Sequence, residues 1–125
     1  MREILFRGKR VDNGEWVEGY YELCGYLVGT IEEDIYPTIT PFNKYKHEVD
    51  PNTVGQWTGA YDKNDKRIFE GDIVDVDGVV YACRWDDGNL EFCLVNEKES
   101  FGIVYVVPYV EVIGNIYDNP ELLEV

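Results

Sequence analysis

Three Asn-Gly or Asp-Gly dipeptides, each flanked by alternating apolar residues, constrain this chain more than any other feature of its sequence. They are Asn13-Gly14, Asp77-Gly78 and Asp87-Gly88. Both central residues of a two-residue hairpin turn need a positive φ, and Asn, Asp and Gly tolerate it. The pattern therefore predicts β-hairpins and a chain that is nearly all β.

A two-residue turn fixes the register of its hairpin, because opposite residues are found by counting outward from the turn. For the first hairpin this count predicts the opposite pairs Val11 with Trp16, Lys9 with Glu18, Arg7 with Tyr20, Phe6 with Tyr21, and Gly8 with Gly19. For the third it predicts Tyr81 with Leu94, Cys83 with Phe92, Trp85 with Leu90, and Arg84 with Glu91. In that register Cys83 and Cys93 project from opposite faces of the sheet and cannot form a disulfide.

Further strands are predicted on both sides of these hairpins. Upstream, residues 26–31 and 36–40 form a hairpin with an acidic loop at residues 32–34, and Pro37 makes the second strand an edge or irregular strand. The segment 41–53 is irregular, with a possible helical turn within 42–48. Downstream, strands are expected at 103–107 and 110–116, separated by Pro108, and a last helical turn follows Asn119-Pro120.

These elements predict one all-β domain in two parts, an N-terminal β-hairpin region over residues 1–55 and a second region over 56–125. The second region has a three-strand meander centred on Asp77-Gly78 and Asp87-Gly88, followed by the two downstream strands. Five short antiparallel strands suit a small SH3-like barrel. An open sheet or another small barrel fits the same alternation.

The net charge of −14, from 25 Asp and Glu against 11 Lys and Arg, argues against binding nucleic acid by phosphate neutralisation. No apolar run approaches the length of a membrane span, and the N-terminus lacks the pattern of a secretory signal. Three scattered cysteines are typical of a reducing compartment. We therefore expect a cytoplasmic protein with no membrane contact.

Three longer blocks carry a more specific signal. They read FRGKRVDNGEWVEG at residues 6–19, TVGQWTG at 53–59 continuing through DKN at 62–64 to EGDIV at 70–74, and VIGNIYDNPELL at 112–123. In this order and spacing the chain resembles the phage-related YopX family over essentially its whole length. The resemblance implies an all-β protein of bacteriophage or prophage origin with a C-terminal SH3-like barrel, and it implies no reaction, cofactor or partner. Asp65 stands where the family more usually has Gly, and Asp tolerates the left-handed conformation.

No motif for a metal, cofactor or catalytic site stands out. The run Asp62-Lys63-Asn64-Asp65 starts like a calcium loop, but Lys66 and Arg67 stand where the EF-hand pattern needs an acidic or amide residue and Gly. Zinc would need about four Cys or His ligands, and His47 is the single histidine. We therefore expect no cofactor and no enzymatic activity. A minor hydrolytic enzyme using an acidic cleft stays an alternative, because 25 carboxylates place some close together.

Four of the basic residues, Arg2, Arg7, Lys9 and Arg10, lie in the first ten positions. A nucleic-acid-binding SH3-like module that uses this basic N-terminal hairpin is therefore a second alternative. The predicted pairing of Lys9 with Glu18 neutralises part of this charge and favours simple cross-strand pairing instead.

Partner binding is the function that composition favours, because acidic charge steers basic partners and aromatic side chains anchor interfaces. Among the aromatic residues, Trp85 and Tyr81 are expected in the core. The tentative contacts with a host or phage protein are Trp57, Tyr61, Tyr105 and Tyr109, although packing in the sheet is the more ordinary role of each. Unpaired edge strands also allow a homo-oligomer.

Overall fold

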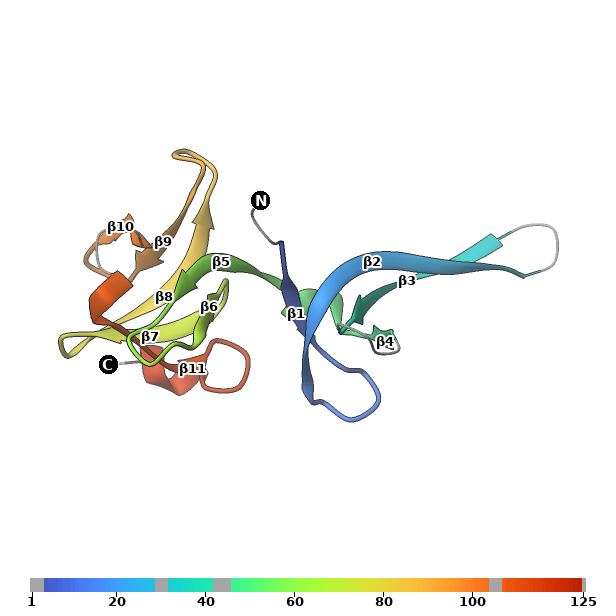
Figure 1. The fold of residues 1–125 in the computed structure, drawn as a ribbon, viewed down its shortest axis with the longest axis horizontal. Helices are drawn as coiled ribbons and strands as arrows, with labels where there is room; N and C mark the ends of the chain where they lie inside the picture. The colour runs from blue at the N-terminus through green and yellow to red at the C-terminus, as the bar shows by residue number, and fades with distance from the viewer. Residues whose placement is uncertain (1–3, 29–31, 42–45, 104–106, 125) are drawn as a thin grey trace. The chain divides into compact units, whose positions relative to one another are not determined.

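The computed structural model describes residues 4–28, 32–41, 46–103 and 107–124. The chain divides into two compact units, Met1–Gln56 and Trp57–Val125. The fold is all β with short 3-10 turns (Figure 1). Both sheets are antiparallel, as the alternation of apolar residues predicted.

The first unit is a sheet built on a long hairpin. Its elements are β1 (Phe6–Lys9), β2 (Trp16–Val28), β3 (Glu32–Thr40), β4 (His47–Glu48), the 3-10 turn η1 (Pro51–Thr53) and the start of β5 (Gly55–Tyr61). The strand order is β4-β3-β2-β1-β5. Ile39 and Val49 are fully buried in this unit. A Cβ atom at Gly19 would collide with the carbonyl oxygen of Thr40, so glycine is needed where β2 and the end of β3 approach.

The predicted register of the first hairpin is wrong by two residues. Lys9 lies opposite Trp16, Gly8 opposite Val17, Arg7 opposite Glu18 and Phe6 opposite Gly19. The loop is wider than two residues, because Gly14 N donates to Arg10 O at 2.9 Å and Arg10 N donates to Glu15 O at 2.9 Å. Arg10 also pairs with Asp12 inside this loop at 2.6 Å.

The hairpin predicted from residues 26–31 and 36–40 is present, but residues 32–34 do not form its turn. Residues 32–34, expected to form an acidic loop, are the first residues of β3, and Glu32 lies opposite Val28. Pro37 lies opposite Leu23, in a strand flanked by β2 and the very short β4. The helical turn expected within 42–48 lies partly outside the described residues. His47, near the end of this segment, belongs to β4.

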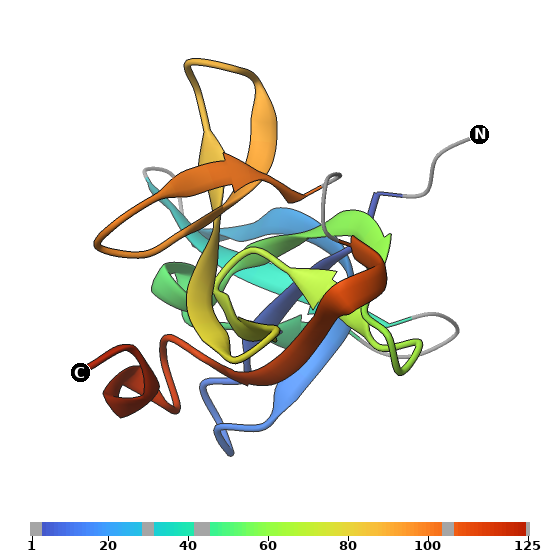
Figure 2. The same ribbon diagram turned by 90° about the vertical axis from the view of Figure 1, so that its left-hand side faces the viewer.

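The second unit holds the remaining elements. These are the rest of β5, then β6 (Arg67–Phe69), β7 (Asp72–Val76), β8 (Val79–Asp86), β9 (Glu91–Val95), β10 (Ser100–Gly102), η3 (Val107–Tyr109), β11 (Val110–Asn115) and η4 (Pro120–Leu123). Trp57 and Tyr61 of β5 pair with β6. The five other strands form a sheet of order β10-β9-β8-β7-β11 (Figure 2).

One face of this five-stranded sheet carries the core of the unit. It is formed by Ile68, Val74, Tyr81, Cys83, Phe92, Leu94, Ile103 and Val110. In the described residues, β10 and β11 are the two edges and the strand pairs do not close the sheet into a barrel. Of the strand expected at 103–107, residues 104–106 lie outside the described residues, and Val107 begins a 3-10 turn. The described residues place a strand earlier, β10 at Ser100–Gly102.

The Asp77-Gly78 turn is confirmed, with Val76 opposite Val79 and φ values of 50° and 89° at Asp77 and Gly78. The Asp87-Gly88 register is wrong by two residues. Cys83 lies opposite Leu94, Trp85 opposite Phe92 and Asp86 opposite Glu91. The loop therefore has four residues, 87–90, because Asp86 closes it with its own carboxylate. A shift of two keeps every side chain on its face, so Cys83 and Cys93 still project from opposite faces, as predicted.

Candidate protein-contact surface

The end of the β8–β9 hairpin projects from the body of the second unit (Figure 1). We call residues 85–91 the hairpin tip. Its loop is organised by Asp86, whose Oδ1 accepts hydrogen bonds from Gly88 N at 2.9 Å and Asn89 N at 3.4 Å, while Oδ2 accepts from Asn89 Nδ2 at 3.0 Å. One side chain thus holds three donors of the loop in place, as Asx turns do.

Trp85 is held in a single orientation at the base of this loop. Its indole Nε1 donates to Asp87 Oδ1 at 2.6 Å, and its ring meets Phe92 edge to face at a centroid distance of 5.0 Å. The side chain nevertheless remains 42% exposed. The expectation that Trp85 belongs to the core is therefore wrong, because the register places it next to the loop and beyond the covered part of the sheet.

Leu90 is the most exposed large apolar side chain of the described residues, at 74%. Its φ is +53°, a left-handed conformation that costs a non-glycine residue about 1 kcal/mol. Gly or Asn would occupy this position without strain. Leu90 is thus both strained and exposed. Because its side chain is mostly in solvent, burial does not offset the cost of the left-handed backbone.

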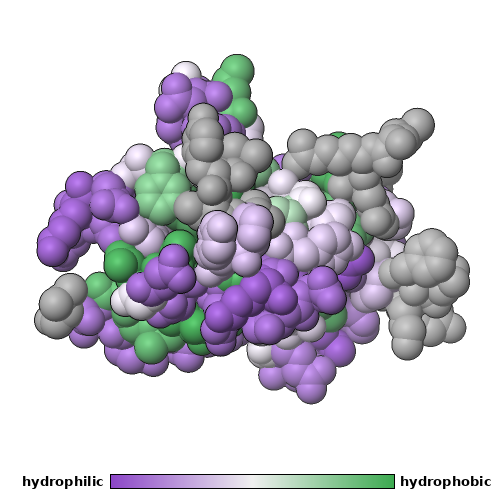
Figure 3. Space-filling view, turned by 60° about the vertical axis from the view of Figure 1, so that its left-hand side comes forward, coloured by the Kyte–Doolittle hydropathy of each residue, from purple (hydrophilic) through white to green (hydrophobic). Residues whose placement is uncertain are grey.

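The tip combines this apolar pair with negative charge. Residues 85–91 contain Asp86, Asp87 and Glu91 and no Lys or Arg. In Figure 3 the tip is the uppermost projection, with a hydrophobic group beside hydrophilic ones. A rigid aromatic and aliphatic pair surrounded by carboxylates is the chemistry of a contact with a basic protein surface.

The structure places the four tentative contact residues differently. Trp57 is 8% exposed, and its Nε1 donates to Ala60 O at 2.9 Å. Its ring meets the Tyr61 ring edge to face at a centroid distance of 5.3 Å, and the Arg67 guanidinium lies over it at 5.1 Å. Tyr61 and Tyr109 are exposed, at 44% and 59%. Tyr105 lies outside the described residues. Trp57 and Tyr61 are thus neighbours, and Trp57 offers little surface to a partner.

Sequence reasoning missed Trp85 and Leu90 as contact residues. A two-residue turn at Asp87-Gly88 would have put them opposite each other on the apolar face. The signal that could have revealed the longer loop is Asp86, which precedes a Gly-Asn pair and can cap it.

The loop that suggested calcium is held together by its own first residue. Asp62 accepts hydrogen bonds from Asn64 N at 2.8 Å, Lys66 N at 2.9 Å and Val112 N at 2.9 Å. Burial alone would raise the pKa of this carboxyl, but the three backbone donors outweigh burial and lower the pKa. Asp65 adopts a φ of +64°, as expected where the family more usually has Gly. Asp62 therefore acts as a turn residue, and its oxygens are already occupied by N–H groups.

Other chemical features of the described residues are few. They contain no group of three or more His, Cys, Asp or Glu side chains placed to hold a metal ion. No helix among them has the length and apolar character needed to cross a membrane. Tyr81 donates its hydroxyl to Glu99 at 2.5 Å, and this hydrogen bond together with burial raises the pKa of Tyr81 to about 12.

The sequence model of the YopX protein family matches residues 5–124. The chain belongs to the YopX family. Among solved structures, this YopX protein is similar to the crystal structure of protein EF1440 from Enterococcus faecalis, with 23% identity and a TM-score of 0.61 over 99% of this chain and 100% of that one. At that identity the likeness concerns the fold alone. No curated protein matches the chain.

Proposed function

We propose that this YopX protein is a non-catalytic, acidic binding module that contacts a basic protein of a phage or its host through the hairpin tip. The observation that carries the proposal is Leu90, which is strained and exposed in the same hairpin tip as Trp85, whose indole is held by Asp87. Strain in a well-ordered loop supports a functional role when folding alone does not require the residue. A pre-ordered apolar pair also loses little conformational entropy on binding.

The charge of the chain supports a basic partner. A net charge of −14 repels anions and accelerates the encounter with cations, whereas the apolar pair supplies contact area once the partner is in place. The cations of β1 that suggested nucleic acid have partners inside the chain. Arg7 and Lys9 lie over the Trp16 ring at 4.8 and 5.7 Å. Arg10, directly after β1, pairs with Asp12, and Arg2 lies outside the described residues.

We propose a phage or prophage accessory role and an SH3-like relationship for the five-stranded sheet, as the resemblance to the YopX family implies. We also propose a cytoplasmic location, which the three scattered cysteines support. The absence of a catalytic role is supported by the use of Asp62 and Asp86 as acceptors for backbone donors.

The proposal is tested with Leu90→Asn in a capture experiment. Asn tolerates positive φ, so this variant removes the apolar side chain while keeping or improving the stability of the loop. Tagged wild-type protein and variant are incubated with nuclease-treated host lysate at low and moderate salt, and retained proteins are identified by mass spectrometry. A basic protein retained by the wild type in a salt-sensitive way should be lost with Leu90→Asn and with Trp85→Ser.

Val11→Ser is the matched control, because Val11 is also an exposed apolar residue, at 55% against 74% for Leu90, and belongs to the first unit, far from the tip in sequence. Retention by this variant should equal that of the wild type. If Leu90→Asn retains the same proteins at the same level as the wild type, the hairpin tip is not the contact and the proposal fails. Tyr61→Ser and Tyr109→Ser then test the exposed tentative contacts in the same assay.

A further inference from the structure

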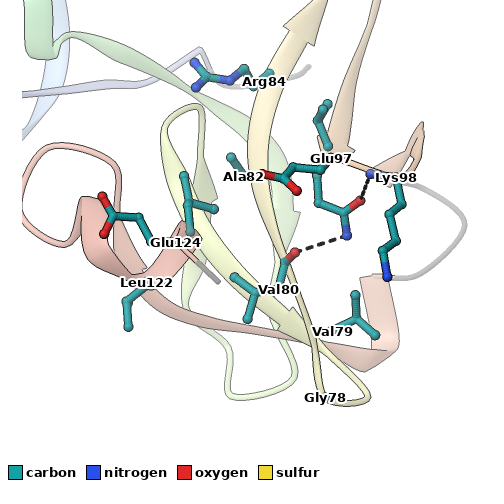
Figure 4. Close-up of a pocket in the computed structure, with 12 residues that line it drawn as sticks. Gly78, Val79, Val80, Ala82, Arg84, Glu97, Lys98, Leu122 and Glu124 are labelled. Carbon is teal, nitrogen blue, oxygen red and sulfur yellow. Dashed lines mark hydrogen bonds between the residues drawn. The ribbon is translucent and has the colours of Figure 1, made fainter.

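A groove runs along the face of the five-stranded sheet that lies opposite its core. Tyr81 and Cys83 point into the core, so the alternate residues of β8, Val80 and Ala82, form the floor of this groove. One wall is the loop at residues 95–98, and the other is η4 with Leu122 and Leu123. The cavity measures about 580 Å³, a size typical of sites that take a small ligand or a side chain (Figure 4). We call it the β8 groove.

Both walls are held by specific hydrogen bonds, so the groove exists before anything binds. Asn96 Oδ1 accepts from Lys98 N at 2.9 Å and Glu99 N at 3.0 Å, and Asn96 Nδ2 donates to Val80 O at 3.3 Å. On the other side, Asn119 N donates to Asn115 O at 2.8 Å, which folds η4 back toward β11. A preformed cavity needs little reorganisation on binding.

Charged groups are arranged unevenly around the apolar floor. Glu97 and Lys98 stand on the loop wall, Glu124 lies on the η4 wall with its carboxylate turned away from β8, and Arg84 lies at one end of the groove (Figure 4). The Glu97 side chain extends toward Ala82. Within the part of the chain that the structure describes, none of these four side chains forms an ion pair. Among these four, Glu97 is therefore the charged side chain that extends over the apolar floor in the middle of the groove.

We propose that the β8 groove receives a lysine or arginine side chain of a partner segment. The alkyl stem lies on Val80, Ala82 and Leu123, and the cationic head lies against the Glu97 carboxylate. Lysine and arginine combine a long apolar stem with a terminal charge, so they match both properties of this cavity. This inference rests on the proposed function because it assumes a basic partner. It adds a second contact on β8, apart from the hairpin tip.

The test uses three small probes and needs no identified partner. N-acetyl-lysine N-methylamide, its norleucine analogue and its glutamate analogue are titrated into the ¹⁵N-labelled full chain. The lysine probe should shift the amide signals of Val80, Ala82, Glu97 and Leu123 with a Kd on the order of millimolar. The norleucine probe, with the same stem and no charge, should bind at least about threefold more weakly, and the glutamate probe should bind more weakly still.

The double variant Glu97→Gln, Glu124→Gln keeps the shape of both side chains and should bring the lysine probe down to the affinity of the norleucine probe. Glu121→Gln is the matched control, because Glu121 is an exposed carboxylate of the same 3-10 turn that does not line the groove. Its affinity for the lysine probe should equal that of the wild type. Unchanged urea midpoints confirm that the variants are folded.

The inference is overturned if the three probes bind alike, if the shifted signals lie outside the groove, or if the double variant binds the lysine probe as the wild type does. Failure of the capture experiment is a separate result. If Leu90→Asn has no effect but the lysine probe binds as described, the hairpin tip fails and the β8 groove stands. If Leu90→Asn abolishes retention in the capture experiment but the lysine probe does not bind as described, the β8 groove fails and the hairpin tip stands.

Discussion

At the scale of single residues, Asp62 joins two distant parts of the second unit. It is 5% exposed, and its carboxylate accepts from its own turn and from Val112, fifty positions further along the chain. Asp62→Asn replaces one acceptor oxygen by a donor, which leaves a buried N–H without a partner. We expect a loss of about 2 kcal/mol in the free energy of unfolding, measured by urea denaturation. Asp65→Asn, the same change at an exposed position of the same turn, should have almost no effect.

The lowered pKa of Asp62 also predicts how this difference depends on pH. A carboxyl with a depressed folded-state pKa stabilises the fold above its unfolded pKa and loses that contribution as the pH falls through the folded value. The gap in stability between wild type and Asp62→Asn should therefore be constant near neutral pH and shrink in acid, below the ordinary Asp pKa of 3.8. A gap that stays constant throughout the acid range would contradict this role of the charge.

Tyr81 is predicted to titrate at unusually high pH. Its pKa of about 12 exceeds the ordinary value of 10.0 because Glu99 accepts its proton in a hydrogen bond and the ring is buried. Stability from this group is complete below the unfolded pKa and is lost as the pH rises toward 12. Ultraviolet difference titration should show one late tyrosine, absent in Tyr81→Phe. Tyr61→Phe is the control and should leave the late step in place.

At the scale of elements, the two Asp-Gly turns of the second unit differ, although their sequences look alike. Gly78 has a φ of +89° and open space around its missing Cβ, whereas Gly88 does not adopt a positive φ. Gly78→Ala should therefore destabilise the protein by about 1 kcal/mol through backbone strain alone. Gly88→Ala should cost only a few tenths, from the contact of its Cβ with Asp86 Oδ1 at 3.2 Å. Equal losses in thermal or urea unfolding would indicate a two-residue turn at both sites.

At the scale of the whole molecule, the charge of −14 on 125 residues opposes folding through self-repulsion. The ion pairs of Lys46 with Glu22 and of Lys63 with Glu111 are exposed and contribute little. Raising NaCl from about 10 mM to about 0.3 M should screen the repulsion and increase stability by on the order of 1 kcal/mol. The control is the same comparison near the isoelectric point of about 4.2, where the salt effect should disappear. A stability that falls with salt at neutral pH would mean that the ion pairs outweigh the repulsion.

Local patterning was sufficient to predict strand content, the faces of the strands and the Asp77-Gly78 turn, because these depend on neighbours within a few residues. Alternation of period two decides which side chains share a face, and a register error of two leaves that face unchanged. Tyr81 and Cys83 were therefore placed correctly in relation to Phe92 and Leu94, although the opposite pairs were wrong.

Turn length and exposure depended on side-chain hydrogen bonds that the alternation of apolar residues does not contain. Asp86 takes three donors of its loop and so excludes the two-residue turn, and this leaves Leu90 in the loop and Trp85 at the end of its strand. Asp62 reaches a backbone donor of β11, and η4 returns to form a wall of the β8 groove. The hairpin tip arises from these local side-chain hydrogen bonds, whereas the β8 groove arises from segments that become neighbours only when the chain is folded.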